Sequence, residues 1–539
     1  MEDDDIIAQK QYIHTAYKST NECNLVEENH TIHDTLHTIK TFLDEYKLSN
    51  PATKRRSTEY HLLKSLNDKY PEVIFKATDK NIGLAALTLD NYNNMVMEHL
   101  SNVTNYKLVA SDCFQRTSLI NELMKKYDAL TNPLYESSYP FYLHEIKFLK
   151  KQANFTLPKF HCLPKLHKQG PLKGRPIAGA VNWITTPISR ILDLRLQDLL
   201  HNEEFSCVLK NSQQLVSDLE LANSFLPNDL EHFYFITGDV QSLYPNIDTN
   251  LLQQLVTQLD FSLERLVEFI CANSYVEYAG RIYQQLNGIA MGTNAAVSLA
   301  NIYMALVVDR YLKPISNVFY YKRYIDDLFI IWKGTLEDWS WVQQGLNQLN
   351  PTIKIDFSSP SKYTMDFLDV TTFFNPITST IGTQIYQKAL NKYLYITPES
   401  CHVPHMFSGF VKGELTRYAR LCSNVYSYEH IKQQFYQRLV DRGYSRRFLN
   451  RIFQTHSWST RLREPHNRKQ WSPILPFVIR YSKRKNIKRV ENFFKRMEDS
   501  FDDYFSNPKL MLVYSRSKNI NDLITSSALT RGQIQLLES

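Results

Sequence analysis

Three aspartates in this chain stand at the ends of strongly apolar segments, where their carboxylates could do chemistry together. Asp239 closes the run Phe233–Val240, and Asp326 and Asp327 interrupt the run Phe319–Trp332. Ionised carboxylates among apolar neighbours are unfavourable, and two or three close together repel one another and raise each other's pKa. A divalent cation relieves that repulsion, and oxygen ligands completed by waters and phosphates suit Mg2+.

Such an acid cluster predicts phosphoryl transfer. Two Mg2+ ions about 4 Å apart can activate an attacking 3′-hydroxyl and stabilise a leaving pyrophosphate. This chemistry depends mainly on positioning and charge neutralisation, so a few aspartates on a rigid sheet suffice and no protein nucleophile is required. A single Asp-Asp turn is usually a solvated hairpin tip, and the interpretation therefore depends on the three acids occurring together and in this order.

The elements that must position these acids are predicted from the apolar pattern. Phe233–Val240 is expected to be a buried strand, and Phe319–Trp332 two strands around the Asp-Asp turn. Pro187–Leu200 carries its apolar residues on one face and is predicted to be a helix. Alternation predicts strand structure over Val73–Leu89, after which a helix should begin near Asp90 as its N-cap. A strand-rich middle with helical ends predicts an α+β fold.

The charge is unevenly spread along the 539 residues. The net charge is +7, yet residues 411–500 contain 21 Lys+Arg against 7 Asp+Glu. After Thr397 the chain is expected to be helical and basic, which favours a lobe that binds a polyanion, with a solvated helical surface as an equal alternative. Seven scattered cysteines without a CxxC pair, an acidic N-terminus and no apolar run of about 20 residues favour an intracellular protein with reduced thiols.

Four motifs resemble the palm motifs of reverse transcriptases and occur in that family's order. They are Asp239–Tyr244, Gly288–Asn301, Tyr324–Asp327 and Phe367–Val370. The finer resemblance is to Penelope-like element reverse transcriptases, a retroelement lineage related to telomerase. The segments that resemble its further motifs are Ala77–Gly83, Leu163–Lys168, Gly174–Ile177, Ser400–His402, Arg417–Ser423 and Asn519–Leu523. The resemblance therefore covers roughly residues 75–525.

The resemblance implies a right-hand polymerase that copies an RNA template by extending a DNA primer with dNTPs. It implies an N-terminal helical region over residues 1–70, fingers and connecting segments over 71–230, a palm with an antiparallel sheet over 231–390, and a helical basic thumb with a C-terminal extension over 391–539. Two Mg2+ ions, with Mn2+ as a possible substitute, are the implied cofactors. A nuclear location follows from the same resemblance and from a basic run described below.

The resemblance also implies roles for single residues. Asp239 and Asp326 would bind both metal ions, Asp327 would assist them, and the backbone carbonyl of Val240 would contribute a ligand. Tyr244 matches the steric-gate position, where its ring would collide with a ribose 2′-hydroxyl. The residues implied in nucleotide binding, besides Tyr244, are Lys165, Lys168, Arg175, Gly288 and Gly292, and those implied in gripping the primer are Phe367, Leu368 and Asp369. Arginine suits a phosphate clamp because its planar fork donates two hydrogen bonds.

Two further segments carry chemistry-bearing residues. The basic run Lys483, Arg484, Lys485, Lys488 and Arg489 could be a nuclear localisation signal, but its interleaved aromatic residues favour contact with the phosphates of a template–primer duplex. Cys401, His402 and His405 lack a fourth ligand and the spacing of a structural zinc site.

The chain also departs from the family pattern. Ala295–Ser298 replaces the Ser-Pro usual in the middle palm motif, and Asn81–Ile82 replaces the Gly-Gly that often follows Asp-Lys. No GIY-YIG endonuclease motif is found before Ser539, so we expect a protein that does not cut its own DNA target. Two alternatives remain open: a domesticated cellular polymerase that accepts rNTPs or needs no template, and a catalytically silent nucleic-acid-binding protein.

Overall fold

The computed structural model describes most of the chain between residues 69 and 538. The described ranges are 69–81, 83–135, 155–166, 170–227, 231–389, 391–462, 474–481, 490–493, 509–515 and 527–538, with single positions at 41, 61, 62, 65, 66, 495 and 525. Four sets of predictions lie outside them. These are nearly all of the N-terminal helical region 1–70, the nucleotide-binding candidate Lys168, the motif Asn519–Leu523 and the basic run Lys483, Arg484, Lys485, Lys488 and Arg489.

The chain divides into two compact units. One comprises Met1–Leu63, Tyr393–Arg420 and Val425–Asn519, and the other comprises Lys64–Lys392, Leu421–Asn424 and Ile520–Ser539. We refer to them as the helical unit and the sheet unit. Every predicted palm residue belongs to the sheet unit. No described helix is long and apolar enough to cross a membrane.

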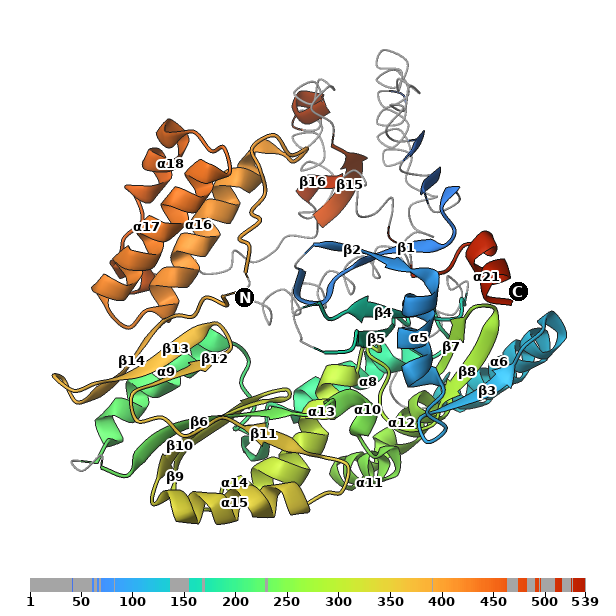
Figure 1. The fold of residues 1–539 in the computed structure, drawn as a ribbon, viewed down its shortest axis with the longest axis horizontal. Coiled ribbons are helices and arrows are strands. Elements are labelled where there is room, and N and C mark those ends of the chain that lie inside the picture. The colour runs from blue at the N-terminus through green and yellow to red at the C-terminus, as the bar shows by residue number, and fades with distance from the viewer. Residues whose placement is uncertain are drawn as a thin grey trace. The chain divides into compact units, whose positions relative to one another are not determined.

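A four-stranded antiparallel sheet lies at the centre of the sheet unit (Figure 1). Its order is β11 (Ile355–Phe357), β6 (Phe233–Val240), β10 (Asp327–Lys333) and β9 (Val318–Tyr324). These bounds confirm the predicted strand that ends in Asp239 and the predicted strand pair around the Asp-Asp turn. Mixed helix and sheet content confirms the α+β class.

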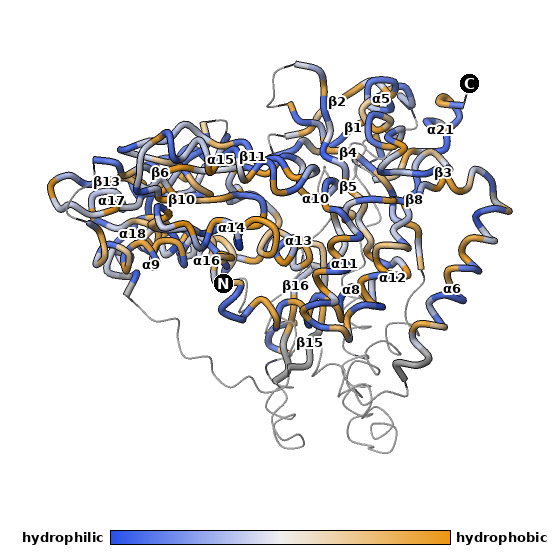
Figure 2. Tube along the Cα trace, turned by 90° about the horizontal axis from the view of Figure 1, so that it is seen from below, coloured by the Kyte–Doolittle hydropathy of each residue, from blue (hydrophilic) through white to orange (hydrophobic). Residues whose placement is uncertain are grey.

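A stretch of each central strand, Phe233–Ile236 on β6 and Leu328–Trp332 on β10, is apolar at consecutive positions because both faces of the sheet are covered. On β6 and β10, Ile236 and Ile330 enter one core cluster, whereas Phe235 and Phe329 enter another. The first cluster includes residues of the helices α13 (Ala296–Met304) and α15 (Leu336–Gln348), and Figure 2 shows hydrophobic colouring along β10 and α13. A continuous apolar run of this length therefore indicates a strand between two layers rather than an edge strand.

Helices cover the first face of the central sheet. The predicted helix at Pro187–Leu200 is confirmed as α8, Thr186–Leu199, with Pro187 in its first turn. The other elements that contribute buried residues to the first core cluster are α10 (Leu243–Asn246), α11 (Thr249–Leu259), α12 (Glu264–Ala272), α13, a π-helical turn (Ala305–Asp309), α14 (Arg310–Leu312) and α15.

A smaller antiparallel sheet and one helix cover the second face. The sheet has the order β12 (Thr364–Phe367), β13 (Val370–Asn375) and β14 (Thr380–Ile385), and the helix is α9 (Ser212–Ala222). Phe367 is buried and its ring centroid lies 5.2 Å from that of Phe329 on β10. The aromatic pair joins the small sheet to the central sheet.

The remaining strands of the sheet unit form three short antiparallel groups. They are β1 (Val73–Ala77) with β2 (Leu84–Thr88), β4 (Phe160–Pro164) with β5 (Gly174–Ala178), and β3 (Tyr106–Ala110), β8 (Arg281–Gln285) and β7 (Tyr275–Tyr278). The helices among them are α5 (Leu89–Leu100), α6 (Cys113–Tyr135) and, at the C-terminus, α21 (Arg531–Glu538). Gln533 of α21 donates a hydrogen bond to the carbonyl of Val73, so these last residues belong with β1.

One predicted helix boundary is wrong by two residues. Asp90 was expected to cap the helix that follows β2, but the cap is Thr88, whose hydroxyl accepts a hydrogen bond from the backbone N–H of Asn91. Asp90 instead lies in the first turn, where its negative charge faces the positive end of the helix dipole. Both residue types are good caps, and the end of the preceding strand decides between them.

The helical unit contains three described helices around an aromatic core. They are α16 (Pro404–Leu421), α17 (Val425–Asp441) and α18 (Arg446–Phe453). Phe435 is fully buried among them, and its ring contacts those of Tyr418 and Phe453. A helical segment after Thr397 is therefore confirmed over this stretch.

The prediction that the chain is purely helical beyond this point is wrong. β15 (Ile474–Arg480) and β16 (Lys509–Ser515) pair in parallel, with Ile474 opposite Lys509. Both strands are rich in β-branched and other large apolar residues, which favour strands over helices. The basic residues around these two strands favour a charged helical surface, and for that reason the strands were not predicted from the sequence.

Candidate active site

Strand register brings two of the three aspartates side by side. Asp239 on β6 and Asp327 on β10 are directly opposed Cα partners. Asp327 is also paired with Tyr324 across the β9–β10 hairpin, so Ile325 and Asp326 form a two-residue turn. The backbone N–H of Val240 donates a 3.1 Å hydrogen bond to the carbonyl of Asp326, which ties the turn to the end of β6.

A fourth acid lies in the same row. Asp356 on β11 is the Cα partner of Asp239 on its other side. Residues directly opposed on neighbouring strands share a face of the sheet, with Cβ atoms about 5 Å apart, and like charges in such positions are destabilising. Gln241 donates a 2.7 Å hydrogen bond to the carboxylate of Asp356, whereas Asp326 and Asp327 lie half-buried at the turn.

Burial and mutual repulsion raise the pKa of two of these acids, as expected for carboxylates that share a cation site. Burial, followed by the charges of Asp326 and Asp239, raises the pKa of Asp327 to about 6. Burial also raises the pKa of Asp326, and the charge of Asp239 contributes to that rise. Among the described residues no group of three His, Cys, Asp or Glu side chains forms a ready-made metal site. The donor set, which consists of carboxylate oxygens that repel one another, nevertheless fits hard divalent cations that keep waters and substrate oxygens as ligands.

Tyr244 is held beside this acid pair by an unusual turn. It is the second residue of the short helix α10, which begins at Leu243. Ser242, the residue before that helix, adopts a left-handed conformation with φ 51°. Burial, followed by the negative charge of Asp326, raises the pKa of Tyr244 to about 12. The half-buried phenol therefore stays protonated and presents a neutral, bulky ring near the acids.

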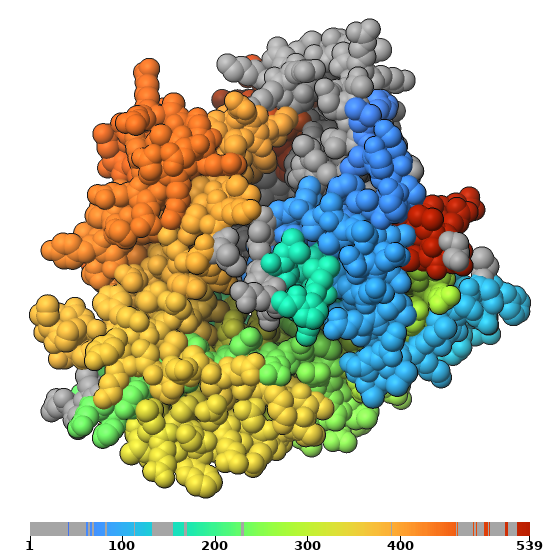
Figure 3. Space-filling view, in the orientation of Figure 1, coloured from blue at the N-terminus to red at the C-terminus, as the bar shows by residue number. Residues whose placement is uncertain are grey.

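Arg175 also acts on the acids, and it already has a partner. Its Nε lies 3.0 Å from the carboxylate of Asp79, which is only 6% exposed, and its charge lowers the pKa of Asp326. The ion pair joins β5 to the turn between β1 and β2. In the space-filling view the teal segment that contains β4 and β5 lies against the blue segment that contains β1 and β2 (Figure 3).

Of the two lysines predicted to bind the nucleotide, only Lys165 lies within the described residues. Lys165 acts electrostatically on His99 and Cys162. The lysines whose charges act on Asp327 are instead Lys80 and Lys388. Lys168 lies outside the described residues.

The two predicted glycines are needed for backbone packing. A Cβ on Gly288, at φ 76°, would lie 2.6 Å from the carbonyl oxygen of Tyr244. A Cβ on Gly292, at φ 110°, would lie 2.9 Å from the Cα of Gly179, close to the strand of Arg175. The segment between them therefore packs directly against the backbones that carry the candidate nucleotide-binding side chains. A close approach to substrate, as the sequence suggested, stays a prediction.

Replacing Gly288 with alanine should destabilise the protein, because the new methyl group would collide with the backbone of the Tyr244–Pro245 segment. Gly280 is a matched control, since its φ of 77° is nearly the same as the 76° of Gly288 but nothing lies within 4 Å of its Cβ position. We expect Gly280→Ala to cost about 1 kcal/mol from backbone strain alone and Gly288→Ala about 2–4 kcal/mol, measured by chemical unfolding. Equal losses would show that the close approach does not constrain the fold.

The predicted primer-grip residues form the expected hairpin. Phe367 and Val370 are paired across the β12–β13 turn, and Leu368 adopts φ 54° within it. The carbonyl of Asp369 accepts a 2.9 Å hydrogen bond from the backbone N–H of Tyr386. The hairpin therefore has fixed ends, while its contact with a primer and the ligand role of the Val240 carbonyl stay predictions.

Sequence reasoning assigned no role to five residues that act on or adjoin the site, one of them being Lys80, described above. Asp356 was hidden because a three-residue strand is too short for a periodic signal. Lys388 and Asp79 lie in segments whose proximity to the acids depends on tertiary folding. Arg323 lies three residues before Asp326 and is fully buried, which its charge and its place in a predicted strand do not indicate.

Comparison with protein families identifies two domains. Residues 166–355 match the family described as reverse transcriptase (RNA-dependent DNA polymerase), and residues 394–454 match the animal helix-turn-helix domain. The first match includes Arg175, Tyr244 and the three aspartates. It supports a polymerase-type domain over these residues. Comparison with curated proteins finds no match.

The chain is similar to three solved polymerase structures at low identity. Telomerase from Candida albicans in complex with a fragment of telomeric RNA shares 10% identity with a TM-score of 0.46, over 68% of this chain and 62% of that chain. Apo telomerase from Candida tropicalis shares 10% identity with a TM-score of 0.42, over 66% and 61%. The RNA-dependent RNA polymerase of BmCPV shares 11% identity with a TM-score of 0.33, over 67% and 34%. The chain thus spans less than two thirds of each of these proteins.

Proposed function

We propose that this protein is an RNA-directed DNA polymerase of the Penelope-like retroelement type, which extends a DNA primer on an RNA template. The observation that carries the proposal is the acid site itself. Asp239 and Asp327 are directly opposed on neighbouring strands, and Asp326 occupies the turn between β9 and β10, all within the reverse transcriptase match. The coarser conclusion, a nucleic-acid polymerase, rests on that match.

In this function the acids would hold two Mg2+ ions, which supply charge neutralisation for the attacking hydroxyl and the departing pyrophosphate. Asp239 and Asp326 would bind both ions, and Asp327 would support them. The chain's part is to keep these carboxylates ionised and fixed, on a sheet buried on both faces. Mn2+ has the same preference for oxygen ligands and could replace Mg2+.

Two residues beside the acids would handle the incoming nucleotide. Arg175 would donate to the triphosphate, which would then compete with Asp79 for the guanidinium. Tyr244 would exclude a ribose 2′-hydroxyl by the bulk of its ring. We further propose a fingers, palm and thumb arrangement. Residues 71–230 would be the fingers with connecting segments, residues 231–390 the palm, and residues 391–539 the thumb with a C-terminal extension. The hairpin at Phe367–Val370 would grip the primer. A nuclear location belongs to the same proposal.

The direct test is primer extension on a poly(rA)–oligo(dT) hybrid with Mg2+ and dTTP. Extension of the DNA primer is expected, and omission of the metal ion should abolish it. A parallel reaction on a DNA template distinguishes RNA-directed from unselective synthesis. Hybrid binding without any extension would instead favour the catalytically silent alternative.

A second candidate function, binding of a nucleic-acid duplex by the helical unit, is supported by its helix pair. α17 and α18 are separated by the four residues 442–445, which include Gly443 at φ 91°, and the segment lies within the helix-turn-helix match. Short connections with glycine are typical of DNA-binding helix-turn-helix motifs, whose second helix enters the major groove. On α18 the buried face holds Leu449 and Ile452, and the exposed face holds Arg446, Arg447, Asn450 and Arg451.

Removing two of these arginines should weaken duplex binding without unfolding the unit. We expect Arg447→Ala combined with Arg451→Ala to lower affinity and to reduce the salt dependence by about one phosphate contact for each arginine that touches the backbone. Fluorescence anisotropy with a DNA duplex and an RNA–DNA hybrid measures both quantities. The control is Arg310→Ala in the sheet unit, where another exposed arginine is paired with Glu204. An unchanged salt slope in the double variant would show that α18 does not contact phosphates.

A further inference from the structure

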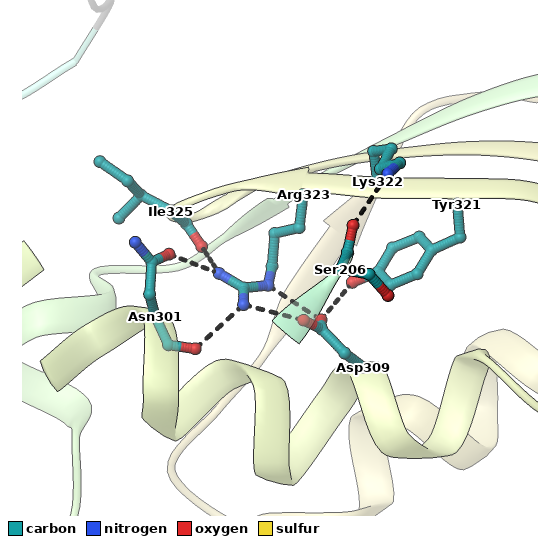
Figure 4. Close-up of polar contacts among 7 residues, drawn as sticks. All are labelled: Ser206, Asn301, Asp309, Tyr321, Lys322, Arg323 and Ile325. Carbon is teal, nitrogen blue, oxygen red and sulfur yellow. Dashed lines mark hydrogen bonds and ion pairs between the residues drawn. The ribbon is translucent and has the colours of Figure 1, made fainter. Parts of the chain in front are cut away.

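A fully buried arginine lies directly beneath the acid turn. Arg323 is 0% exposed, on β9, and its side chain has five N–H donors, the full complement of a guanidinium. Nε and Nη2 donate to the two carboxylate oxygens of Asp309, each at 2.9 Å. Nη1 and Nη2 also donate to the side-chain and backbone oxygens of Asn301, at 2.9 and 3.0 Å. Figure 4 shows the guanidinium enclosed by these partners.

The fifth hydrogen bond runs to the acid turn itself. Nη1 of Arg323 donates a 2.8 Å hydrogen bond to the carbonyl of Ile325, the residue immediately before Asp326 (Figure 4). The neighbouring Lys322 turns away from the acid turn and donates to the carbonyl of Ser206. Of these two adjacent basic residues, therefore, Arg323 alone is bonded to the turn.

The turn needs such an anchor because its conformation is strained. Ile325 adopts φ 57°, a left-handed conformation that favours glycine and is unfavourable for a β-branched residue. Two-residue hairpin turns with a positive φ at their first central position usually have glycine there. The strain, of about 1–3 kcal/mol for such positions, persists only where surrounding contacts enforce it.

A local irregularity in the helix layer places the partner of Arg323. Asp309 ends a π-helical turn, Ala305–Asp309, that follows α13, the helix of Asn301. Such turns occur frequently at functional sites. Tyr321, two residues before Arg323 on the same strand, donates a 2.6 Å hydrogen bond to the same carboxylate. The charge pair is therefore completely enclosed and hydrogen-bonded.

We propose that Arg323 is a positioning residue. Asp309 and Asn301 fix its guanidinium, which binds the carbonyl of Ile325 and thereby holds Asp326 and Asp327 in place. The inference rests on the proposed polymerase function. Arg323 touches neither substrate nor metal in this role. Because the rate of phosphoryl transfer is sensitive to misplacement of about 1 Å, loosening the turn should lower kcat on the order of 100-fold.

A competing explanation is that the network only stabilises the fold. A buried ion pair is weak evidence for either role, since its removal destabilises a protein whether or not a site depends on it. The two explanations differ in one respect. If Arg323 acts by holding Ile325 in a strained conformation, a glycine at residue 325 should reduce the effect of substituting Arg323. If the ion pair only stabilises the fold, that effect should be the same with isoleucine or glycine at residue 325.

The experiment is a double-mutant cycle between Arg323→Lys and Ile325→Gly in the full chain. Lysine keeps the charge beside Asp309 but cannot supply five fixed donors. Tyr321→Phe is the matched control, because it removes a hydrogen bond to the same Asp309 without touching the turn. Each variant is measured for kcat and KM in primer extension, for hybrid affinity by anisotropy, and for thermal unfolding without metal or substrate.

We expect Arg323→Lys to lower kcat on the order of 100-fold with hybrid affinity unchanged, and to lower it less than about tenfold in the Ile325→Gly background. The loss in melting temperature caused by Arg323→Lys should shrink in that background as well. Tyr321→Phe should lower the melting temperature by a few degrees, and Ile325→Gly should not alter its effect. Additive effects of Arg323→Lys and Ile325→Gly on both kcat and melting temperature would overturn the proposal.

The unfolding measurement separates this inference from the proposed function. A wild-type protein that extends no primer, but in which Arg323→Lys and Ile325→Gly still couple in melting temperature, would overturn the polymerase function and support the anchoring of the turn. An active wild type with no coupling in either measurement would leave the polymerase function intact and overturn the role of Arg323. If Arg323→Lys does not fold, Asn301→Ala, which removes one acceptor of Nη1, takes its place in the cycle with a smaller expected effect.

Discussion

Replacing Asp326 with asparagine should lower the rate of primer extension by at least about 1,000-fold, because a neutral amide cannot balance the charge of the proposed metal ions. Asp239→Asn should have a similar effect, and Asp327→Asn a smaller one. Single-turnover extension of a DNA primer on an RNA template measures all three. Hybrid affinity should stay unchanged, since phosphate contacts elsewhere carry that binding.

Asp356→Asn is the matched control for this prediction. Asp356 lies in the same row of acids and is the Cα partner of Asp239, but its carboxylate accepts a hydrogen bond from Gln241 and it is not one of the proposed ligands. We expect less than about a tenfold loss of rate. If Asp356→Asn and Asp326→Asn were equally inactive, the assignment of the ligand set would be wrong.

Asp327→Asn should not destabilise the protein at neutral pH. Burial and the neighbouring acids raise the pKa of Asp327 to about 6. Because this lies above the unfolded value of about 4, ionised Asp327 destabilises the folded state increasingly as the pH rises from about 4 to 6, and fully above that range. Asp327→Asn should therefore be as stable as the wild type or more stable at pH 7.5 in EDTA, with the difference shrinking toward pH 5. A large loss of stability at pH 7.5 would contradict this account of the acid site.

Replacing Tyr244 with alanine should allow the enzyme to incorporate ribonucleotides. Removal of the ring opens the space in which a 2′-hydroxyl would lie, and we expect the preference for dTTP over rUTP to fall on the order of 100-fold. The measured quantity is the ratio of kcat/KM for the two nucleotides. This ratio is internal to each variant, so any loss of folded protein caused by the smaller side chain cancels.

Tyr244→Phe separates the ring from its hydroxyl. The phenylalanine keeps the bulk of the ring and should keep the discrimination within a factor of about three. If both variants discriminate as the wild type does, Tyr244 is a core residue rather than a steric gate. If the wild type itself accepts rUTP efficiently, the alternative of a cellular polymerase with relaxed nucleotide choice gains support.

Much of the fold around the acids was predictable because it is local. The runs Phe233–Val240 and Phe319–Trp332 each contain consecutive apolar residues, such as Phe233–Ile236 and Leu328–Trp332, which in short segments indicate strands buried on both faces. Their bounds agree with the observed strands β6, β9 and β10. The hairpin at Phe367–Val370 was likewise indicated by a motif whose residues are neighbours in the chain.

Contacts between distant residues could not be predicted in this way. Arg175 and Asp79 are 96 positions apart, and nothing in the periodicity of either segment indicates their ion pair. Arg323 bonds to residues 14 and 22 positions away, across the layer between sheet and helices. Such partners depend on how layers pack, whereas periodicity reports only which face of an element is buried.

The sequence by itself determined that three aspartates end apolar strands, and with them the class of chemistry. Only the tertiary structure decided the register that places Asp239 between Asp327 and Asp356, because a shift of one residue along a strand moves every side chain to the opposite face. It also decided that the acid turn is strained at Ile325 and anchored from below by a buried charge. Residue types specify what a site can do, but the distances at which it works come from packing between segments that are remote in the chain.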